Sequence, residues 1–390
     1  MAIDNKDKKV LNVPPLRFPE FSGEWEEHTL SEYLEFKNGL NPDAKRIGQG
    51  LPFISVMDIL AEGVITYNSI RGKVEATDKE IDCFGVKNGD LLFQRSSETL
   101  EDVGRANVYM DSRTAVYGGF VIRGRKIGNY VPLFFKYLLA TPLARKKTCR
   151  MGAGAQHFNI GQEGLSKISL SFPSVKEQEK IANLLSLIDE RIATQNKIIE
   201  DLKKLKSAIS KKLLCNDKWT TYKIQDIAEI GRGRVISSVE IEKQRHPLYP
   251  VYSSQTSNDG IMGYLDNYMF DGEYITWTTD GANAGTVFYR NGKFNCTNVC
   301  GTLKIHLQFD CHFVSLVLQQ ATQKYVSSNL ANPKLMNNTM ASIKIRMPDM
   351  ETQKRLSKVF QTLDSRLLVH QCTYEMYLRE KQYLLNQMFI

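Results

Sequence analysis

Cysteine and histidine side chains cluster in one stretch of the sequence, where they could ligate a metal ion. They are Cys296, Cys300, His306, Cys311 and His312. Structural zinc sites usually combine two pairs of ligands at defined spacings, whereas this single Cys-x-x-x-Cys pair has no matching second pair. We therefore expect cysteines buried on strands and no metal site.

Motifs for catalytic chemistry are also missing. The sequence has no Gly-x-x-x-x-Gly-Lys-Ser/Thr loop, which excludes a P-loop ATPase. An adenine methyltransferase needs a glycine-rich cofactor loop and an Asn/Asp-Pro-Pro-aromatic tetrapeptide, and neither Gly231–Gly233 nor Asn12–Pro15 fits. His28 and His157 have no nucleophile pattern around them. We predict a binding protein with no catalytic residues. A self-contained enzyme whose metal-binding carboxylates converge only on folding is an alternative.

The composition is that of a folded, multidomain protein. Its 390 residues, 42% hydrophobic and 24% charged, predict two or three domains. The net charge of +8 permits nucleic-acid binding without demonstrating it, and seven cysteines, an odd number, fit reduced thiols. No apolar run approaches the ~18 residues of a membrane span. Residues 1–10 lack the apolar core of a secretory signal, so we expect a cytoplasmic protein with no membrane contact.

The chain repeats itself, and the repeat determines the predicted architecture. The segment Phe172–Gln178 recurs as Met347–Gln353, and Trp25 recurs as Trp219. Between the repeated segments lie variable blocks in which short β-like runs alternate with turn signals. The sequence predicts a first globular domain over residues 1–173, a spacer helix over 174–215, a second globular domain over 216–348 and a second spacer helix over 349–390.

Both spacer segments lack Gly and Pro, and their apolar residues alternate in steps of three and four, which is typical of a coiled-coil seam. Ser174 with Glu177, and Asp349 in the second copy, are N-cap signals. Polar residues interrupt the seam at equivalent places in the two copies, Gln195 with His370 and Lys206 with Lys381. Register control, partner contacts and plain solvent exposure are the alternatives for them. At ~1.5 Å per residue each helix would extend roughly 60 Å. Two amphipathic helices, each packed on its own domain, are the alternative. The predicted seam residues are Ile181, Leu185, Ile188, Ile192, Ile199, Leu202, Leu356, Phe360, Leu363, Leu367, Tyr374 and Tyr377.

Several of these features together resemble the DNA-specificity subunit of type I restriction-modification systems. They are the repeated Pro173–Gln178 and Pro348–Gln353 stretches, the helices after them, and the opening Leu16–Phe21 with Trp25. The segment Trp277–Gly285 resembles that family's target-recognition domains. The resemblance covers nearly the whole chain. It implies an α+β fold in which two target-recognition domains are separated by two long helices that pair as an antiparallel coiled coil, with an internal pseudo-twofold repeat.

The resemblance also implies a function. Each domain would recognise one half of a bipartite double-stranded DNA target, and the helices would act as a ruler. In this family the specificity subunit binds two modification subunits, which methylate adenine N6 with S-adenosylmethionine, and restriction subunits, which are motor-nucleases that use ATP and Mg²⁺. The cofactors would belong to these partners and none to this chain. A two-headed scaffold that binds proteins instead of DNA is the main rival, and salt-dependent DNA affinity would discriminate the two.

Base recognition needs Arg, Asn or Gln at base edges and Lys, Arg, Ser or Thr at phosphates, and we expect such residues on loops. Thr352 stands where the first copy has Glu177, and Ala331 where it has Gln156, so the second domain need not repeat every contact of the first. The candidates are Gln94, Arg95, Ser96, Arg105, Arg145, Lys146, Lys147, Arg150, Gln156, His157 and Asn159 in the first domain, and Arg232, Arg234, Ser254, Gln255, Asn258, Thr278, Thr279, Asn283, Asn332 and Lys334 in the second.

Charged residues outside the seam also repeat. Asp189 and Arg191 recur as Asp364 and Arg366. They could form salt bridges between the helices or contact the modification subunits, and the sequence favours neither interpretation.

Overall fold

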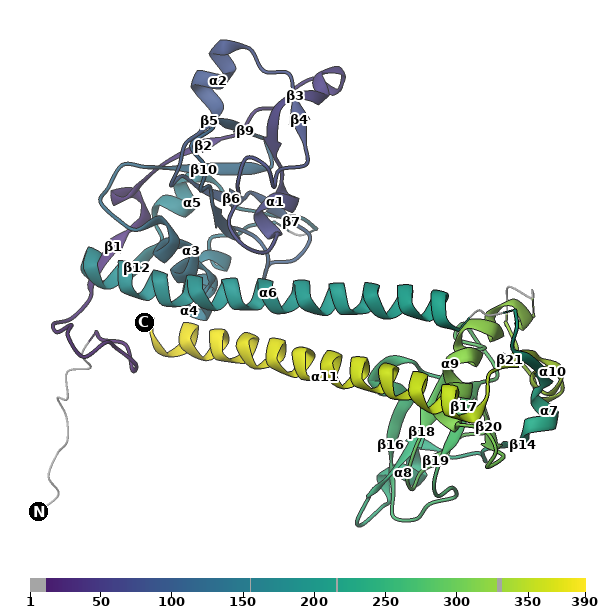
Figure 1. Cartoon of the computed structure of the whole chain (residues 1–390). Coiled ribbons are helices and arrows are strands. Elements are labelled where there is room, and N and C mark those ends of the chain that lie inside the picture. Colours follow the sequence, from purple (N-terminus) through teal and green to yellow (C-terminus); the bar gives the residue numbers. More distant parts are fainter. Residues whose placement is uncertain (1–11, 155, 215–216, 328–331) are drawn as a thin grey trace, which may run out of the picture. The chain divides into compact units, whose positions relative to one another are not determined.

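The computed structural model describes residues 12–154, 156–214, 217–327 and 332–390 (Figure 1). The chain forms two compact units. The first contains the residues up to Asn196 together with Cys372–Ile390, and the second contains Lys197–Gln371. Ala331, which entered the repeat comparison, lies outside the described residues. Among those that are described, no helix is long and apolar enough to cross a membrane.

Two long helices, α6 (Val175–Leu213) and α11 (Met350–Gln387), lie within the two segments that lack Gly and Pro. Both predicted N-caps form. The backbone N–H of Glu177 donates to the Ser174 hydroxyl at 3.4 Å, and that of Thr352 donates to the Asp349 carboxylate at 2.9 Å. These bonds satisfy backbone donors that the first turn of a helix leaves without a helical partner.

Each unit contains one half of each long helix, and the halves contact each other. In the first unit Lys381 Nζ lies 2.6 Å from Asp189 Oδ1, and in the second unit Lys206 pairs with Asp364. In the first unit Asp189 contacts Lys381 and Arg191 lies beside the Tyr377 ring, so residue numbers rise along α6 as they fall along α11 and the two helix segments pair antiparallel. Lys206 and Lys381 therefore interrupt the seam to make ion pairs. Every predicted seam residue is buried or half-buried.

The seam also packs on the globular domains. Ile181, Leu185 and Ile188 belong to the same apolar core as the first-domain sheet, and so do Leu384 and Phe389 at the end of α11. Leu356 and Phe360 belong to the core of the second domain. The two interpretations of the spacer helices are therefore both partly right, because each helix packs on a domain and on the other helix.

The two domains are built on four-stranded antiparallel sheets of matching order. In the first, the order is β2 (Leu34–Asn38), β10 (Val121–Lys126), β6 (Leu91–Gln94) and β8 (Ala106–Val108). In the second, it is β14 (Ala228–Arg232), β20 (Cys300–Ile305), β17 (Tyr274–Thr278) and β18 (Val287–Arg290). A two-stranded sheet joins the start of each domain to its end. β1 (Glu26–Thr29) pairs with β12 (Ser169–Phe172), which directly precedes α6, and β13 (Thr220–Lys223) pairs with β21 (Lys344–Met347), which directly precedes α11. This correspondence confirms the internal repeat.

The smaller sheets share three strands in the same order and orientation, and they differ in a fourth strand, which the first sheet has. The first has β4 (Lys73–Val74), β3 (Ile47–Ile54), β9 (Ala115–Tyr117) and β5 (Gly85–Val86), over a second apolar core. The second has β16 (Ile261–Leu265), β15 (Tyr249–Tyr252) and β19 (Asn295–Cys296), over a small cluster of Ile236, Val251 and Leu265. The shorter helices are α1 (Val56–Leu60), α2 (Asp78–Phe84), α3 (Pro132–Ala140), α4 (Pro142–Cys149), α5 (Gln162–Ser166), α7 (Ile224–Ile227), α8 (Ser238–Glu242), α9 (Cys311–Ala321) and α10 (Asn337–Ser342).

The repeated glutamines explain the repeated proline-to-glutamine motif. Gln178 accepts a hydrogen bond from the backbone N–H of Val131 at 3.0 Å, directly before α3, and donates to the Pro173 carbonyl. Gln353 accepts from the N–H of Asp310 at 3.0 Å, directly before α9, and donates to the Pro348 carbonyl. Each buried glutamine thus fixes the start of a long helix to the start of a shorter helix in the preceding domain, α3 or α9.

Candidate functional site

The polar residues predicted in the first domain meet where β6 ends. The short strand β7 (Ser96–Ser97) pairs with β11 (Phe158–Asn159), and the Ser96 hydroxyl donates to the side-chain oxygen of Asn159. The backbone N–H of Arg95 donates to the Phe120 carbonyl at 2.9 Å. Residues 95–96 and 156–159, which are far apart in sequence, therefore form one surface.

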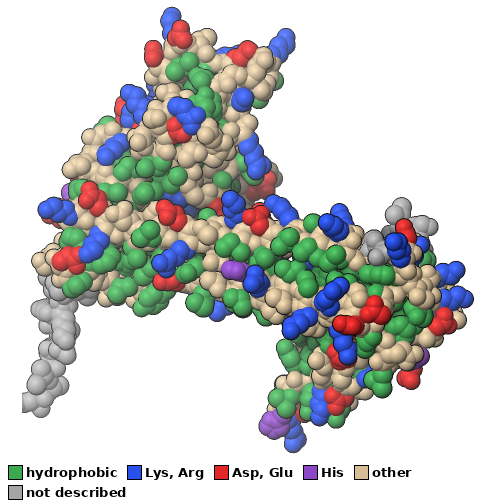
Figure 2. All heavy atoms as spheres, in the orientation of Figure 1, with side chains coloured by type: hydrophobic (Ala, Val, Ile, Leu, Met, Phe, Trp, Pro, Cys, Tyr) green, Lys and Arg blue, Asp and Glu red, His purple; other side chains and the backbone are tan. Residues whose placement is uncertain are grey.

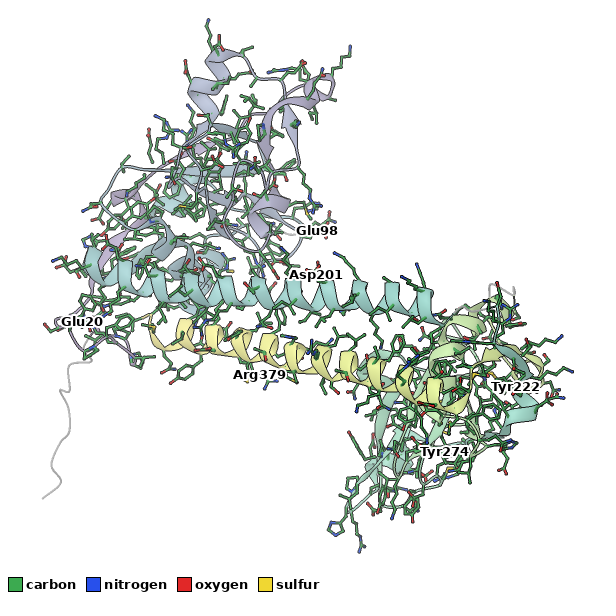
Figure 3. All side chains as sticks on the ribbon, in the orientation of Figure 1. Glu20, Glu98, Asp201, Tyr222, Tyr274 and Arg379 are labelled. Carbon is green, nitrogen blue, oxygen red and sulfur yellow. The ribbon has the colours of Figure 1, made fainter. Side chains whose placement is uncertain are left out.

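The side chains of this surface are available to a ligand to different degrees. Gln156, His157 and Asn159 are exposed, whereas Arg95 is half-buried and donates to the Gly119 carbonyl at 3.3 Å. Glu98, labelled in Figure 3, is exposed in the loop that directly follows β7. Amide, imidazole and guanidinium groups here can donate to base edges or phosphates.

Three of the candidate side chains are buried, and for Gln94 and Thr278, which end strands, the expectation of a position on a loop is wrong. Gln94 is the last residue of β6, is 4% exposed, and donates to the Ser96 carbonyl. Thr278 and Thr279 are 1% and 0% exposed, and the Thr279 hydroxyl lies 3.0 Å from the Val299 carbonyl. These side chains support the backbone beneath the surface.

The basic residues of α4 do not form one exposed row. Arg145 donates to the carbonyls of Glu101 and Val103, and burial lowers the pKa of its guanidinium. Lys147 donates to the Ser169 carbonyl at 2.8 Å. Lys146 and Arg150 are exposed, and so is Arg105, which precedes β8 and pairs with Asp102 at 2.7 Å.

In the second domain, Asp280 brings two candidate cations together. Arg232 Nη2 lies 3.4 Å from one Asp280 oxygen, and Lys334 Nζ lies 3.5 Å from the other. Asp280 itself was not predicted as a site residue, and its position inside the Trp277–Gly285 stretch is the signal that could have identified it. Arg232, Asp280 and Lys334 thus form a partly exposed cluster with two positive charges and one negative charge.

Four of the remaining candidates of the second domain lie on or beside the loop 254–260. Asn283 Nδ2 donates to the Ser254 carbonyl at 3.3 Å, and the Gln255 side chain donates to the Ile261 carbonyl. Asn258 is exposed at the tip of this loop. Arg234 pairs with Glu240, and Asn332 is exposed.

The cysteine and histidine cluster does not converge on a metal site. Cys300 and Cys311 are buried, and burial raises the pKa of their thiols to about 11 and about 12. The His312 ring lies 2.8 Å from the Ser357 hydroxyl, and burial lowers the pKa of His312. Within the part of the chain that the structure describes, no group of three or more His, Cys, Asp or Glu residues could hold a metal ion.

The repeated charges on the long helices fall into two groups. Asp189 and Asp364 make the ion pairs between α6 and α11. Arg191 and Arg366 are exposed, and the guanidinium of Arg191 lies 5.8 Å from the centre of the Tyr377 ring. The aspartates therefore act between the helices, and contact of the arginines with a partner stays a prediction.

Comparison with known proteins gives a consistent result. A family model described as the type I restriction modification DNA specificity domain matches residues 22–204 and 216–373. A Mycoplasma pneumoniae protein named as type I specificity subunit S.MpnORF201P is 37% identical over 231 residues, which are 58% of this chain and 96% of that relative. The type I restriction enzyme MpnII specificity subunit of the same organism is 39% identical over 178 residues, which are 45% of this chain and 53% of its own length.

Solved structures have the same fold. The S subunit of a type I restriction-modification system from M. genitalium matches 97% of this chain and 99% of its own chain, with a TM-score of 0.68 at 16% identity. A chain from a structural study of complex assembly and conformational transition of the type I R-M system matches 96% of this chain and 99% of its own, with a TM-score of 0.56 at 12% identity.

Proposed function

The chain belongs to the type I restriction-modification DNA specificity family, and from this premise we propose that it recognises a bipartite DNA sequence and directs modification and restriction subunits to it. Each domain would bind one half of the target. The long helices would set the spacing between the halves. Methylation of adenine N6 with S-adenosylmethionine, and cleavage driven by ATP and Mg²⁺, would be carried out by those partner subunits.

The observation that carries the proposal is one sheet order present twice with different loops. The four strands of β2-β10-β6-β8 correspond to those of β14-β20-β17-β18, whereas the smaller sheets differ in their fourth strand and in the segments that connect their strands. Two copies of a frame with different recognition loops suit two different half-sites. A partner that presents the same surface to both domains would instead need matching loops in the two domains.

Polar groups for DNA are present in both domains. In the first, Gln156, His157 and Asn159 are exposed beside Arg95, and amide and guanidinium groups suit base edges. In the second, the Arg232–Asp280–Lys334 cluster supplies the cations that suit phosphates. A specific DNA site requires both kinds of contact, because base contacts give specificity and phosphate contacts fix the position of the protein on the duplex.

Both units have exposed apolar side chains on their parts of the long helices, which would contact the modification subunits. In the first unit Leu187 on α6 and Met376 on α11 are 57% and 65% exposed, and in the second unit Leu368 and Val369 on α11 are 61% and 62% exposed. Figure 2 shows hydrophobic side chains interspersed with charged ones on the surface of the molecule. Exposed apolar side chains on helices commonly mark protein interfaces, and Arg191 and Arg366 would add polar contacts.

Single-molecule sequencing of genomic DNA from host cells with and without this gene tests the proposal. A split N6-methyladenine motif that disappears with the gene is the expected result, and it gives both half-sites. If no motif depends on the gene in cells that express the modification subunits, the proposal fails. The purified chain should also lose DNA affinity steeply with added salt through counterion release, whereas a protein-binding scaffold would bind no DNA.

A further inference from the structure

A single buried arginine holds the most strained loop of the second domain. Arg290, the last residue of β18, has a side chain that is 3% exposed. Its guanidinium donates to the Asp259 carboxylate at 2.5 Å and to the Asp259 carbonyl at 2.8 Å. A third bond runs to the Thr276 hydroxyl on β17 at 3.3 Å. The arginine therefore joins the main sheet to the loop 254–260.

Aromatic rings fix the plane of this guanidinium. Its central carbon lies 3.6 Å from the centre of the Tyr252 ring and 4.5 Å from that of the Phe288 ring. A planar guanidinium stacks on rings and donates in a fixed fork, which a lysine ammonium cannot do. The arginine thus specifies both the position and the orientation of the groups it binds.

The loop needs such support because of its backbone. Asn258 and Asp259 have φ values of 49° and 52°, and Gly260 follows at 81°. The left-handed region disfavours residues that carry a Cβ, although Asn and Asp tolerate it best. A free chain would leave this conformation readily, so contacts from the rest of the domain must maintain it.

We infer that Arg290 is the positioning residue of the second recognition domain, and this inference rests on the proposed function. By clamping Asp259, it holds Asn258 at the exposed tip of the loop and Gln255 beside it, in the conformation that meets the second half-site. Asn and Gln amides can make paired hydrogen bonds to adenine. Contacts that are already in place before binding avoid the entropy cost of ordering the loop on DNA.

The first domain provides an internal control, because the equivalent position carries no arginine. In the matching sheets Leu91 pairs with Val108 across β6 and β8 as Ile275 pairs with Tyr289 across β17 and β18. Arg290 therefore corresponds to Tyr109, a buried tyrosine. Loss of the clamp should therefore affect the second half-site and leave the first unchanged.

The test uses the full-length chain expressed with its modification subunits in host cells. Arg290→Lys keeps the charge but loses the fork, and Asp259→Ala removes the carboxylate half of the anchor, whose side chain is 65% exposed, without changing the core. Asp271→Ala, at another exposed carboxylate of the same domain, is the matched control. Genomic N6-methyladenine is sequenced for each variant, and methylation is compared between the full motif and sites that differ by one base in either half.

We expect both clamp variants to lose at least about fivefold in discrimination at one or more bases of the second half-site, which corresponds to weakening a base contact of ~1 kcal/mol. Discrimination in the first half and in Asp271→Ala should not change. Unchanged second-half discrimination in Asp259→Ala, or an equal loss in both halves, would overturn the inference. If the wild-type chain gives no split motif at all, the proposed function fails instead.

Discussion

The two ion pairs between the long helices are related by the repeat, yet they should differ in strength. Asp189 recurs as Asp364, and Lys206 as Lys381, so Asp189–Lys381 and Lys206–Asp364 place the same chemistry in two environments. The Asp189 side chain is 21% exposed and also accepts a hydrogen bond from the Tyr137 hydroxyl at 2.9 Å. The Asp364 side chain is 42% exposed. Burial and the Tyr137 bond should make Asp189 the more important carboxylate.

The magnitude follows from these environments. Truncating Asp189 leaves a half-buried lysine and a tyrosine hydroxyl without their acceptor, and bonds to charged groups contribute about 1.5 to 3 kcal/mol each when sheltered from water. We expect Asp189→Ala to lower the free energy of opening of the first unit by ~2 to 3 kcal/mol, and Asp364→Ala to lower that of the second by ~0.5 kcal/mol. Tyr137 stays a neutral donor, because burial and the Asp189 carboxylate both raise its pKa.

Native-state hydrogen exchange measures these local free energies, with peptides from the two halves of α6 analysed separately. Double-mutant cycles with Lys381→Ala and Lys206→Ala isolate each pair from other effects. Glu190→Ala, at an exposed neighbour on α6, is the control and should stay within about 0.5 kcal/mol of wild type. If Asp364→Ala costs as much as Asp189→Ala, the reasoning from burial and the tyrosine bond is wrong.

Four further outcomes are expected. Arg95→Ala should weaken recognition of one half-site only, by ~1 to 3 kcal/mol if it contacts a base, and duplexes altered in each half would show it. Deleting residues 194–200 and 370–376 keeps both helix ion pairs but shortens each helix by ~10 Å, so the unmethylated spacer in the sequenced motif should shorten by about three base pairs, and an unchanged spacer would disprove the ruler. Gln178→Ala should destabilise the start of α6 by ~1 to 3 kcal/mol in urea unfolding, because it orphans the Val131 N–H. Burial lowers the pKa of His312, so below the ordinary value of about 6.5 the unfolded state binds more protons than the folded state. Stability should fall as the pH drops below that value, and His312→Gln should remove this dependence from thermal melts.

The long helices were predictable from the sequence, because they depend on the spacing of apolar residues and on cap residues that lie close together in the chain. The seam spacing and the absence of Gly and Pro placed the two long helices, and Ser174 and Asp349 placed their caps. One detail of the first cap differs. Glu177 does not complete a capping box but binds Arg17 at 2.7 Å, a partner that is distant in sequence. This pair also explains why Thr352 can replace Glu177 in the second copy, where its hydroxyl lies 2.9 Å from the Asp349 carboxylate.

Features that depend on which way a side chain points were not predictable. Gln94 and Thr278 end their strands facing inward, and the pattern of a four- or five-residue strand does not fix the direction of its last residue. Arg290 acts through a partner distant in sequence and belongs to no motif, whereas Asp280 lies inside the Trp277–Gly285 stretch and binds cations distant in sequence. The residue types of the polar surfaces could thus be predicted, but the side chains that support them could not.

The contacts within and between the two copies of the repeat explain why the helices must stay similar while the loops can differ. Asp189 of the first copy binds Lys381 of the second, so a change in either helix must suit the other copy. The repeated glutamines and their backbone partners lie within one copy, but their positions are fixed by the helices. The loop 254–260 contacts Arg290 of its own domain, and Arg290 in turn stacks on Tyr252 of the same domain. Such a loop can change together with its own clamp while the helices stay complementary, and this independence is what a protein with two separately specified half-sites requires.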